Sequence, residues 1–368
     1  MDAVSALPLT TRPGWLDWLR RALAPAPGRW DMTLRIVVTT VLVVIISMAL
    51  QIPEVLLSAF MVIFVTKENK VITTLVGTML ILGVTIAIGI SILVYRCTFD
   101  YPEIRVPVMA AVLFAGFFAL RVLAVGPLGF GIGFVVAATQ SIAELMPSAE
   151  YLVRWLLWFW VAITYPIVLT VIVNRLMASA PKPKTGGPPK PRKRMVAADA
   201  FSNPAHVHFA LKVTLAAMTC YIIYTGLDWA GIHTAFITCC FISLESMGAT
   251  LHKGTLRLAG CACGGLLGFL SIMYLVPHME SIVSLALLIA AVAALAGWVA
   301  AGSERIAYAG LQIALAFYMC ILQDLAPDTD FVKIRDRIVG IVLGIAVTTL
   351  VYRYIWPERG PEGARQAR

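Results

Sequence analysis

The sequence predicts an all-α membrane protein built from two six-helix transmembrane repeats, with about twelve spans in all. Hydrophobic residues make up 60% of the 368 residues and charged residues 13%, a composition far from that of a soluble domain. Similar polar positions also recur in the two halves of the chain. Because each half holds an even number of apolar spans, we expect the repeats to be related by a pseudo-two-fold axis along the membrane normal.

The first segment, residues 1–31, is expected to be cytoplasmic. Within residues 13–24, Trp15, Trp18 and Leu19 fall on one helical face, with charged residues off it. This pattern predicts an amphipathic helix that lies in the membrane interface or packs on the cytoplasmic side of the protein. No apolar core followed by a small-residue cleavage site precedes the first span, so we expect that span to remain as an anchor.

The two repeats are separated by a basic, proline-rich linker at 177–206, which we expect to be solvated. The spans of the first repeat, 32–176, are expected at 32–50, 53–66, 71–95, 104–122, 125–146 and 151–176. Those of the second repeat, 207–356, are expected at 207–226, 229–243, 254–276, 280–301, 304–323 and 336–356. The remaining 357–368 should form a cytoplasmic tail.

Matching charges mark the repeat. Arg35 in the first span corresponds to Lys212 in the seventh, and Lys70 before the third span corresponds to Lys253 before the ninth. Basic residues also set the orientation, because they concentrate on the cytoplasmic side of membrane proteins. With the N-terminus inside, the 29 Lys and Arg residues fall inside except Arg96, Arg105, Arg154, Lys333, Arg335 and Arg337. We therefore expect a multi-pass protein of the bacterial inner membrane with both termini cytoplasmic.

The stretch from 228 to 268 concentrates the polar groups of the second repeat. Its apolar segment, 230–243, is short for a membrane crossing and is bordered by polar side chains. A basic turn and a helix with three glycines at four-residue spacing follow. Gly260, Gly264 and Gly268 predict close packing against another helix. We infer a substrate or proton pathway here, and its candidate residues across the chain are Arg35, Lys212, Asp228, His233, Thr234, Glu245, Arg257 and Gln312.

Each candidate also has a structural interpretation. Orientation and snorkelling explain Arg35 and Lys212 about as well as an anion site between them does. His233 either titrates during transport or bonds a neighbouring helix. Glu245 and Arg257 fit ion pairs at a cytoplasmic elbow, and Gln312 fits a hydrogen bond between helices.

Other chemistries find no support in the sequence. The seven cysteines show neither metal-ligand nor disulfide spacing, and no metal site is expected. No GxxxxGK[ST] motif or catalytic constellation occurs, so we expect neither an enzyme nor a cofactor. The basic balance follows membrane topology and does not indicate nucleic acid.

Three segments resemble the MdtO-like branch of the fusaric acid resistance (FUSC) family. They are MVAADAFSNPAHVHFALKVTLAAMTCYIIYTGLDWAGIHTAFITC from Met195, SERIAYAGLQIALAFYMCILQD from Ser303 and KIRDRIVGIVLGIAVTTLVYRYIWPE from Lys333. Residues 35–176 resemble the same branch more loosely. Larger members similar to this chain carry soluble cytoplasmic regions, which are replaced here by the linker or nearly absent.

The resemblance implies an aromatic acid exporter or multidrug resistance component of the cell inner membrane. Its expected contacts are the lipid bilayer, a small organic anion or drug substrate, a periplasmic adaptor protein and an outer-membrane channel. We expect proton-coupled efflux of aromatic or organic acids or drugs. The alternatives are a passive organic-anion channel between the halves, as a more distant similarity to plant aluminium-activated malate channels suggests, or a non-transporting membrane scaffold.

The predicted orientation can be tested with reporter fusions. A fusion at Lys190 should report a cytoplasmic position and one at Asp328 a periplasmic position, because basic residues are retained inside. A periplasmic result at Lys190 would contradict the two-repeat organisation.

Overall fold

The computed structural model describes residues 22–143, 146–177, 195–243, 247–322 and 331–356. Regular structure in these ranges is helical, apart from one isolated bridge between Leu123 and Val196. The helices of the first half are α2 (Arg29–Ala49), α3 (Val55–Val65), α4 (Lys70–Thr98), α5 (Pro102–Val122), α6 (Gly126–Ser141) and α7 (Ala149–Leu176). Those of the second half are α8 (Pro204–Gly226), η2 (Ala230–His233), α9 (Thr234–Ile242), α10 (Met247–Tyr274), η3 (Val276–His278), α11 (Ile282–Ala300), α12 (Glu304–Ile321) and α13 (Phe331–Tyr354).

The prediction of an all-α membrane protein is confirmed. Eight of the described helices are long and apolar enough to cross a membrane, judged by length and composition. The shorter apolar helices are α3, α6, the η2–α9 segment and α12. They occupy the second and fifth positions of each half. At 11 residues, α3 is about 17 Å long, well below the hydrocarbon thickness of a bilayer.

Helix pairs of the first half recur at the matching positions of the second. In the first half α2 packs on α3, α4 packs on α6 and α7, and α5 packs on α6. In the second half α8 packs on α9, α10 packs on α12 and α13, and α11 packs on α12. Between the halves α2 packs on α11, and α5 packs on α8. Each of these two contacts joins the first helix of one half to the fourth helix of the other.

The hydrophobic core is shared between the halves. One cluster joins α5 and α6 to α8, α9 and α13, and includes Phe117, Ala137 and Phe236. Another joins α2 and α3 to α10, α11 and α12, and includes Ile36 and Phe317. Burial of apolar surface in these two clusters therefore stabilises the packing of one half against the other.

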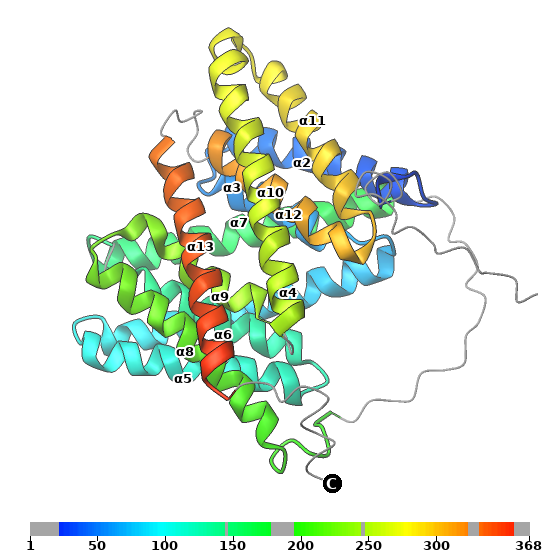
Figure 1. Ribbon diagram of the computed structural model, residues 1–368. Helices are drawn as coiled ribbons and strands as arrows, with labels where there is room; N and C mark the ends of the chain where they lie inside the picture. The colour runs from blue at the N-terminus through cyan, green and yellow to red at the C-terminus, as the bar shows by residue number, and fades with distance from the viewer. Residues whose placement is uncertain (1–21, 144–145, 178–194, 244–246, 323–330, 357–368) are drawn as a thin grey trace, which may run out of the picture.

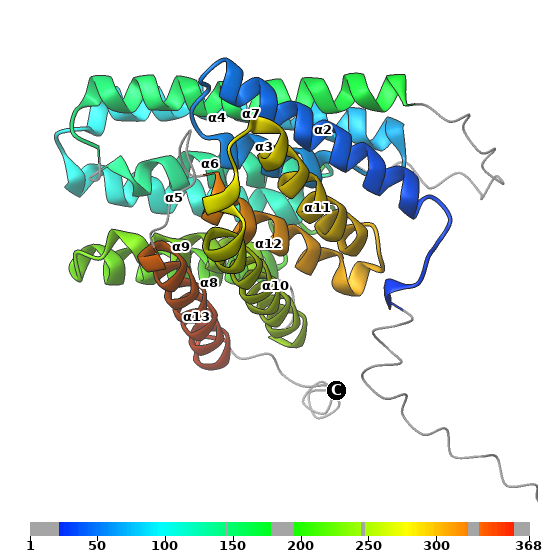
Figure 2. The same cartoon turned by 90° about the horizontal axis from the view of Figure 1, so that it is seen from above.

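Two helix pairs at matching positions of the halves differ in direction. In Figures 1 and 2, α4 and α7 run alongside each other, as do α10 and α13, and the second pair crosses the first steeply. Two pairs that cross cannot both stand upright in one flat bilayer. At least one pair must therefore be tilted, which is a common way to fit long helices into a membrane.

The predicted glycine stripe lies against α12. A Cβ added at Gly260 would approach the Ala309 carbonyl oxygen to 2.7 Å, and one at Gly268 would approach the Cys320 Cβ to 2.6 Å. At Gly264 it would overlap the Ile313 carbonyl oxygen. The absence of side chains along this stripe lets α10 and α12 approach closely.

We expect Gly264→Ala to lower the free energy of unfolding by about 1–3 kcal/mol, because the added methyl group forces the two backbones apart. Gly264→Leu should reduce the amount of folded protein further. The measurement is the melting temperature and yield of the purified protein. Gly248→Ala is the matched control, since nothing lies within 4 Å of a Cβ at that position of the same helix. A normal yield and melting temperature for Gly264→Leu would contradict this role.

Candidate functional site

A buried cation on α10 forms the centre of the candidate site. Arg257 is only 3% exposed. Its Nε donates a hydrogen bond to Thr238 Oγ1 on α9 (3.1 Å), and its Nη1 lies 3.2 Å from Gln312 Oε1 on α12. Nη1 also lies 3.2 Å from the hydroxyl of Tyr308. These acceptors are all neutral, and among the described residues no carboxylate pairs with Arg257.

The neighbourhood of this cation adds positive charge and a thiol. Lys253, one turn earlier on α10, places its Nζ 5.1 Å from the ring centre of Tyr308. Cys261, one turn later, points its Sγ at Gln312 Oε1 over 3.6 Å. Two cations therefore lie on one face of α10, in an environment where an isolated charge is costly. Glu245, which the sequence analysis placed near them, lies outside the described residues.

The candidate site extends along the short helix α9 towards the N-terminus of that helix. Thr238 Oγ1 donates to the Thr234 carbonyl oxygen at 2.7 Å. Thr234 is 3% exposed, and its Oγ1 has no hydrogen-bond partner. His233 precedes it, half-buried, with Nδ1 2.9 Å from the Ala230 carbonyl oxygen. Thr234, Arg257 and Gln312 are thus linked through Thr238, which the sequence analysis did not select.

Arg337 is a second residue that sequence reasoning missed. The sequence analysis assigned it to an outside segment, but α13 begins at Phe331 and Arg337 is buried within it, 7% exposed. Its Nη1 lies 2.9 Å from Met319 Sδ on α12, and its charge acts on His233. The position of Arg337 inside the apolar pattern of the last span was the available indication.

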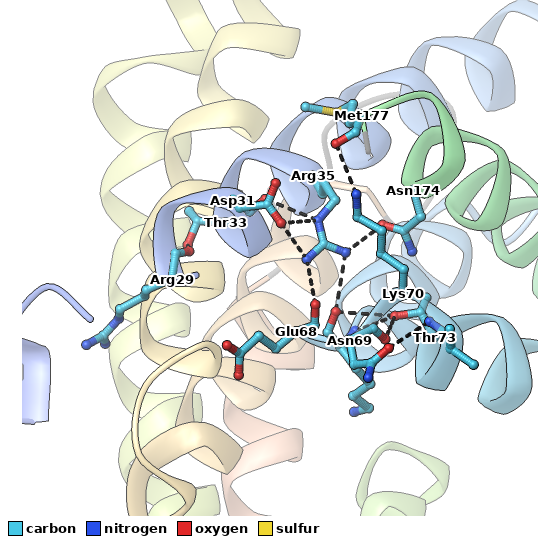
Figure 3. A network of polar contacts seen from close by, with 12 residues as sticks. Arg29, Asp31, Thr33, Arg35, Glu68, Asn69, Lys70, Thr73, Asn174 and Met177 are labelled. Atoms are coloured by element: carbon cyan, nitrogen blue, oxygen red, sulfur yellow. Dashed lines mark hydrogen bonds and ion pairs between the residues drawn. The ribbon is translucent and has the colours of Figure 1, made fainter. Parts of the chain in front are cut away.

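Arg35, by contrast, is fully occupied. It is 1% exposed, and every nitrogen of its guanidinium has an acceptor. Figure 3 shows the group surrounded by Asp31, the loop after α3 and the end of α7. Its Nη2 lies 2.9 Å from Asp31 Oδ2, and its Nη1 lies 2.8 Å from Asn174 Oδ1. The carbonyl oxygens of Lys67 and Glu68 accept the remaining bonds, at 3.3 and 3.2 Å. This pattern favours a structural role in joining α2, α7 and that loop.

Lys212 and Asp228 also lie apart from the Arg257 site. Lys212 donates from Nζ to the Trp356 carbonyl oxygen at 2.6 Å, beyond the end of α13. Asp228 is exposed in the turn after α8, where its φ of 49° is left-handed. These contacts place Arg35 and Lys212 at the ends of their own halves and do not support the expectation of one anion held between them.

Polar contacts in the connecting segments also join the halves. Arg121 of α5 donates from Nε to His206 Nδ1 on α8 at 3.2 Å. His206 Nε2 lies 3.4 Å from Asp199 Oδ2, an ion-pair distance when the ring is protonated. The hydrogen bond from Asn203 lowers the pKa of Asp199, and burial lowers the pKa of Lys67 in the loop beside Arg35. Across the described residues, no cluster of His, Cys, Asp and Glu could hold a metal ion.

The second half matches a known family. Residues 216–351 match the model of the fusaric acid resistance protein-like family. This range holds Arg257, Gln312 and Arg337.

Similar proteins extend the comparison. The multidrug resistance protein MdtO of Escherichia coli strain K12 is 23% identical over an alignment of 503 residues. The alignment covers 97% of this chain and 74% of that protein. MdtO of Shigella flexneri is 37% identical over 177 residues, covering 48% of this chain and 26% of that protein. No solved structure matches. The family and MdtO matches confirm the resemblance inferred from the sequence.

We expect Arg35→Met to lower the free energy of unfolding by about 3 kcal/mol, because buried partners lose their donor. Asp31→Asn should cost about 1 kcal/mol or less, since the Asp31 side chain is 39% exposed and solvated. Thermal unfolding of both purified variants provides the measurement. An Arg35→Met protein with normal stability but without acid transport would instead assign Arg35 to the substrate.

Proposed function

We propose, on the premise of this resemblance to the fusaric acid resistance family, that the chain is an inner-membrane efflux component for organic acids or drugs. The observation that carries the proposal is the buried guanidinium of Arg257, whose hydrogen-bond partners among the described residues are all neutral. The pathway runs through the second half, where α9, α10 and α12 surround this cation.

An uncompensated charge is costly inside a membrane protein. A cation inside a membrane protein costs at least a few kcal/mol unless a partner offsets it. Thr238, Tyr308 and Gln312 supply dipoles but no negative charge. An anionic substrate would supply that charge while it passes through the protein. Arg257 can therefore favour binding of the anion, while its neutral partners hold it when no substrate is bound. Because these acceptors are neutral, a bound anion does not have to compete with a carboxylate of the site for the guanidinium of Arg257.

The twelve-span repeat belongs to the same proposal. Its support is the set of matching helix contacts and the short helices at the second and fifth positions of both halves. Short segments at corresponding positions are the usual place for a substrate site in repeat transporters. An axis along the membrane normal would turn a tilted pair of one half into an oppositely tilted pair of the other, consistent with the crossing in Figure 1.

Energy coupling separates two candidate functions. In the transporter, His233 would be the candidate proton carrier, because it lies half-buried at the start of α9, next to Thr234. A passive anion channel is favoured by the same cationic lining and needs no titrating group. Flux of benzoate into proteoliposomes with and without a pH gradient distinguishes them. A periplasmic adaptor and an outer-membrane channel would complete the export route for the transporter.

We expect Arg257→Gln to reduce benzoate flux in proteoliposomes by about tenfold or more, because the anion loses its charged partner. Flux of the cationic dye ethidium should fall much less. Arg257→Lys should keep part of the benzoate flux, since it keeps the charge but not the planar fork. Arg154→Gln is the control, because this exposed arginine lies on α7 away from the site. Equal losses for benzoate and ethidium would sink the assignment of Arg257 to the anion.

A further inference from the structure

Arg337 presents an unused hydrogen-bonding edge inside the second half. Its side chain is 7% exposed, and its Nε and Nη2 are buried without a hydrogen-bond partner. Among the residues that the structure describes, the hydrogen bond of this guanidinium is the one from Nη1 to Met319 Sδ, at 2.9 Å. A buried cation with two free donors is unusual, because unpaired buried donors and charges both carry a large desolvation cost.

The nearest acidic side chain along the helix is already engaged. Asp336 accepts a hydrogen bond from Trp229 Nε1 at 2.9 Å and pairs with Nη2 of Arg335 at 2.7 Å. Arg335 is the exposed member of this pair, with its side chain 61% accessible. Neighbouring arginines on α13 thus differ sharply, since one is solvated and paired while the other is buried with its charge uncompensated.

The geometry of the free edge identifies a ligand group. Nε and Nη2 of a guanidinium direct two N–H bonds side by side, and this spacing matches the two oxygens of a carboxylate. We propose that Arg337 binds the carboxylate group of an organic acid through these two bonds. The proposal deepens the efflux function above and rests on it for the identity of the acid as a transported substrate.

The surroundings of Arg337 support an anion site. Among the described residues, Thr234 contributes a buried hydroxyl without a hydrogen-bond partner, and His233 precedes it at the start of α9. Gly340, one turn after Arg337 on α13, lies against Thr234, because a Cβ there would overlap Thr234 Oγ1. The glycine keeps α13 close to the start of α9. The Thr234 hydroxyl is therefore held near the helix face from which the guanidinium of Arg337 extends.

This site and the Arg257 site border the same short helix. Thr234 is next to the Arg337 side, and Thr238, one turn along α9, bonds Arg257 directly. An acid that leaves Arg257 therefore meets a second cation at the other end of α9. Two successive binding sites allow an acid to pass on from the first, because binding at several sites favours release over permanent retention.

The test is equilibrium binding to the purified full chain in lipid nanodiscs. Sodium benzoate is the probe, with benzamide as its uncharged analogue and sodium chloride at equal ionic strength as the halide control. Binding is followed by isothermal titration calorimetry and by the melting temperature from tryptophan fluorescence. We expect benzoate to bind and to raise the melting temperature, while benzamide and chloride leave it unchanged.

Arg337→Gln should weaken benzoate binding by about tenfold or more, because both charged hydrogen bonds are lost. Arg337→Lys should weaken it less, since it keeps the charge without the paired donors. Arg335→Gln removes one positive charge two residues away and should leave benzoate binding unchanged. Without benzoate, Arg337→Gln should melt at the same temperature as the unaltered chain or higher, because an unpaired buried charge has been removed.

Several outcomes would overturn the proposal. Unchanged benzoate affinity in Arg337→Gln and Arg337→Lys would place the carboxylate elsewhere. An equal effect of chloride would make this a halide site, and a lower melting temperature with unchanged affinity would make Arg337 structural. Failure of the efflux function is distinguishable, since benzoate would then bind in an Arg337-dependent manner without any flux. Normal Arg257-dependent flux without Arg337-dependent binding would leave the efflux function standing and remove this site.

Discussion

The structure depends on how each buried cation is compensated in a chain that is 60% hydrophobic. Three arginines illustrate the range within the described part of the chain. Arg35 has acceptors at every nitrogen, Arg257 has neutral acceptors without a counter-charge, and Arg337 has one edge without a hydrogen-bond partner. Because an unpaired charge is costly in such surroundings, full compensation indicates a structural role. Incomplete compensation is the feature on which the proposed anion sites at Arg257 and Arg337 rest.

Backbone packing makes the incompletely compensated site possible. The glycine stripe on α10 brings α12 close enough for Gln312 to reach Arg257, and Gly260 itself lies against the Cβ of Gln312. Gly340 and Gly344 bring α13 equally close to Thr234 and Thr238 of α9. Glycine thus positions the polar side chains by removing bulk between the helices that carry them. In this half, the glycines and the buried cations therefore belong to the same packing arrangement of α9, α10, α12 and α13.

The sequence predicts the helices well, because long apolar runs bounded by charges have few alternative structures in a membrane protein. It also marks Arg257 and Gln312 as candidates, because their polarity contrasts with that of their helices. It does not reveal that Arg35 is held by the main-chain oxygens of Lys67 and Glu68, because backbone acceptors leave no pattern in side chains. Nor does it place Arg337 inside the protein, since charged residues near a helix start resemble a solvated loop. The steep crossing of the helix pairs depends on packing between distant segments.

The two halves also differ in a way that bears on the number of sites. In the register that matches Lys70 and Gly77 with Lys253 and Gly260, the counterpart of Arg257 is Thr74. The Thr74 hydroxyl bonds the Lys70 carbonyl oxygen within its own helix at 3.1 Å, so it offers no charge to a ligand. Arg35, whose charge is compensated, joins α2 of the first half to α7 and to the loop after α3. On the proposed two-repeat organisation, the second half has a buried cation at the position of Arg257 where the first half has a hydroxyl, among the described residues. The proposed anion site then has no charged counterpart in the first half at this register, which favours one pathway per chain.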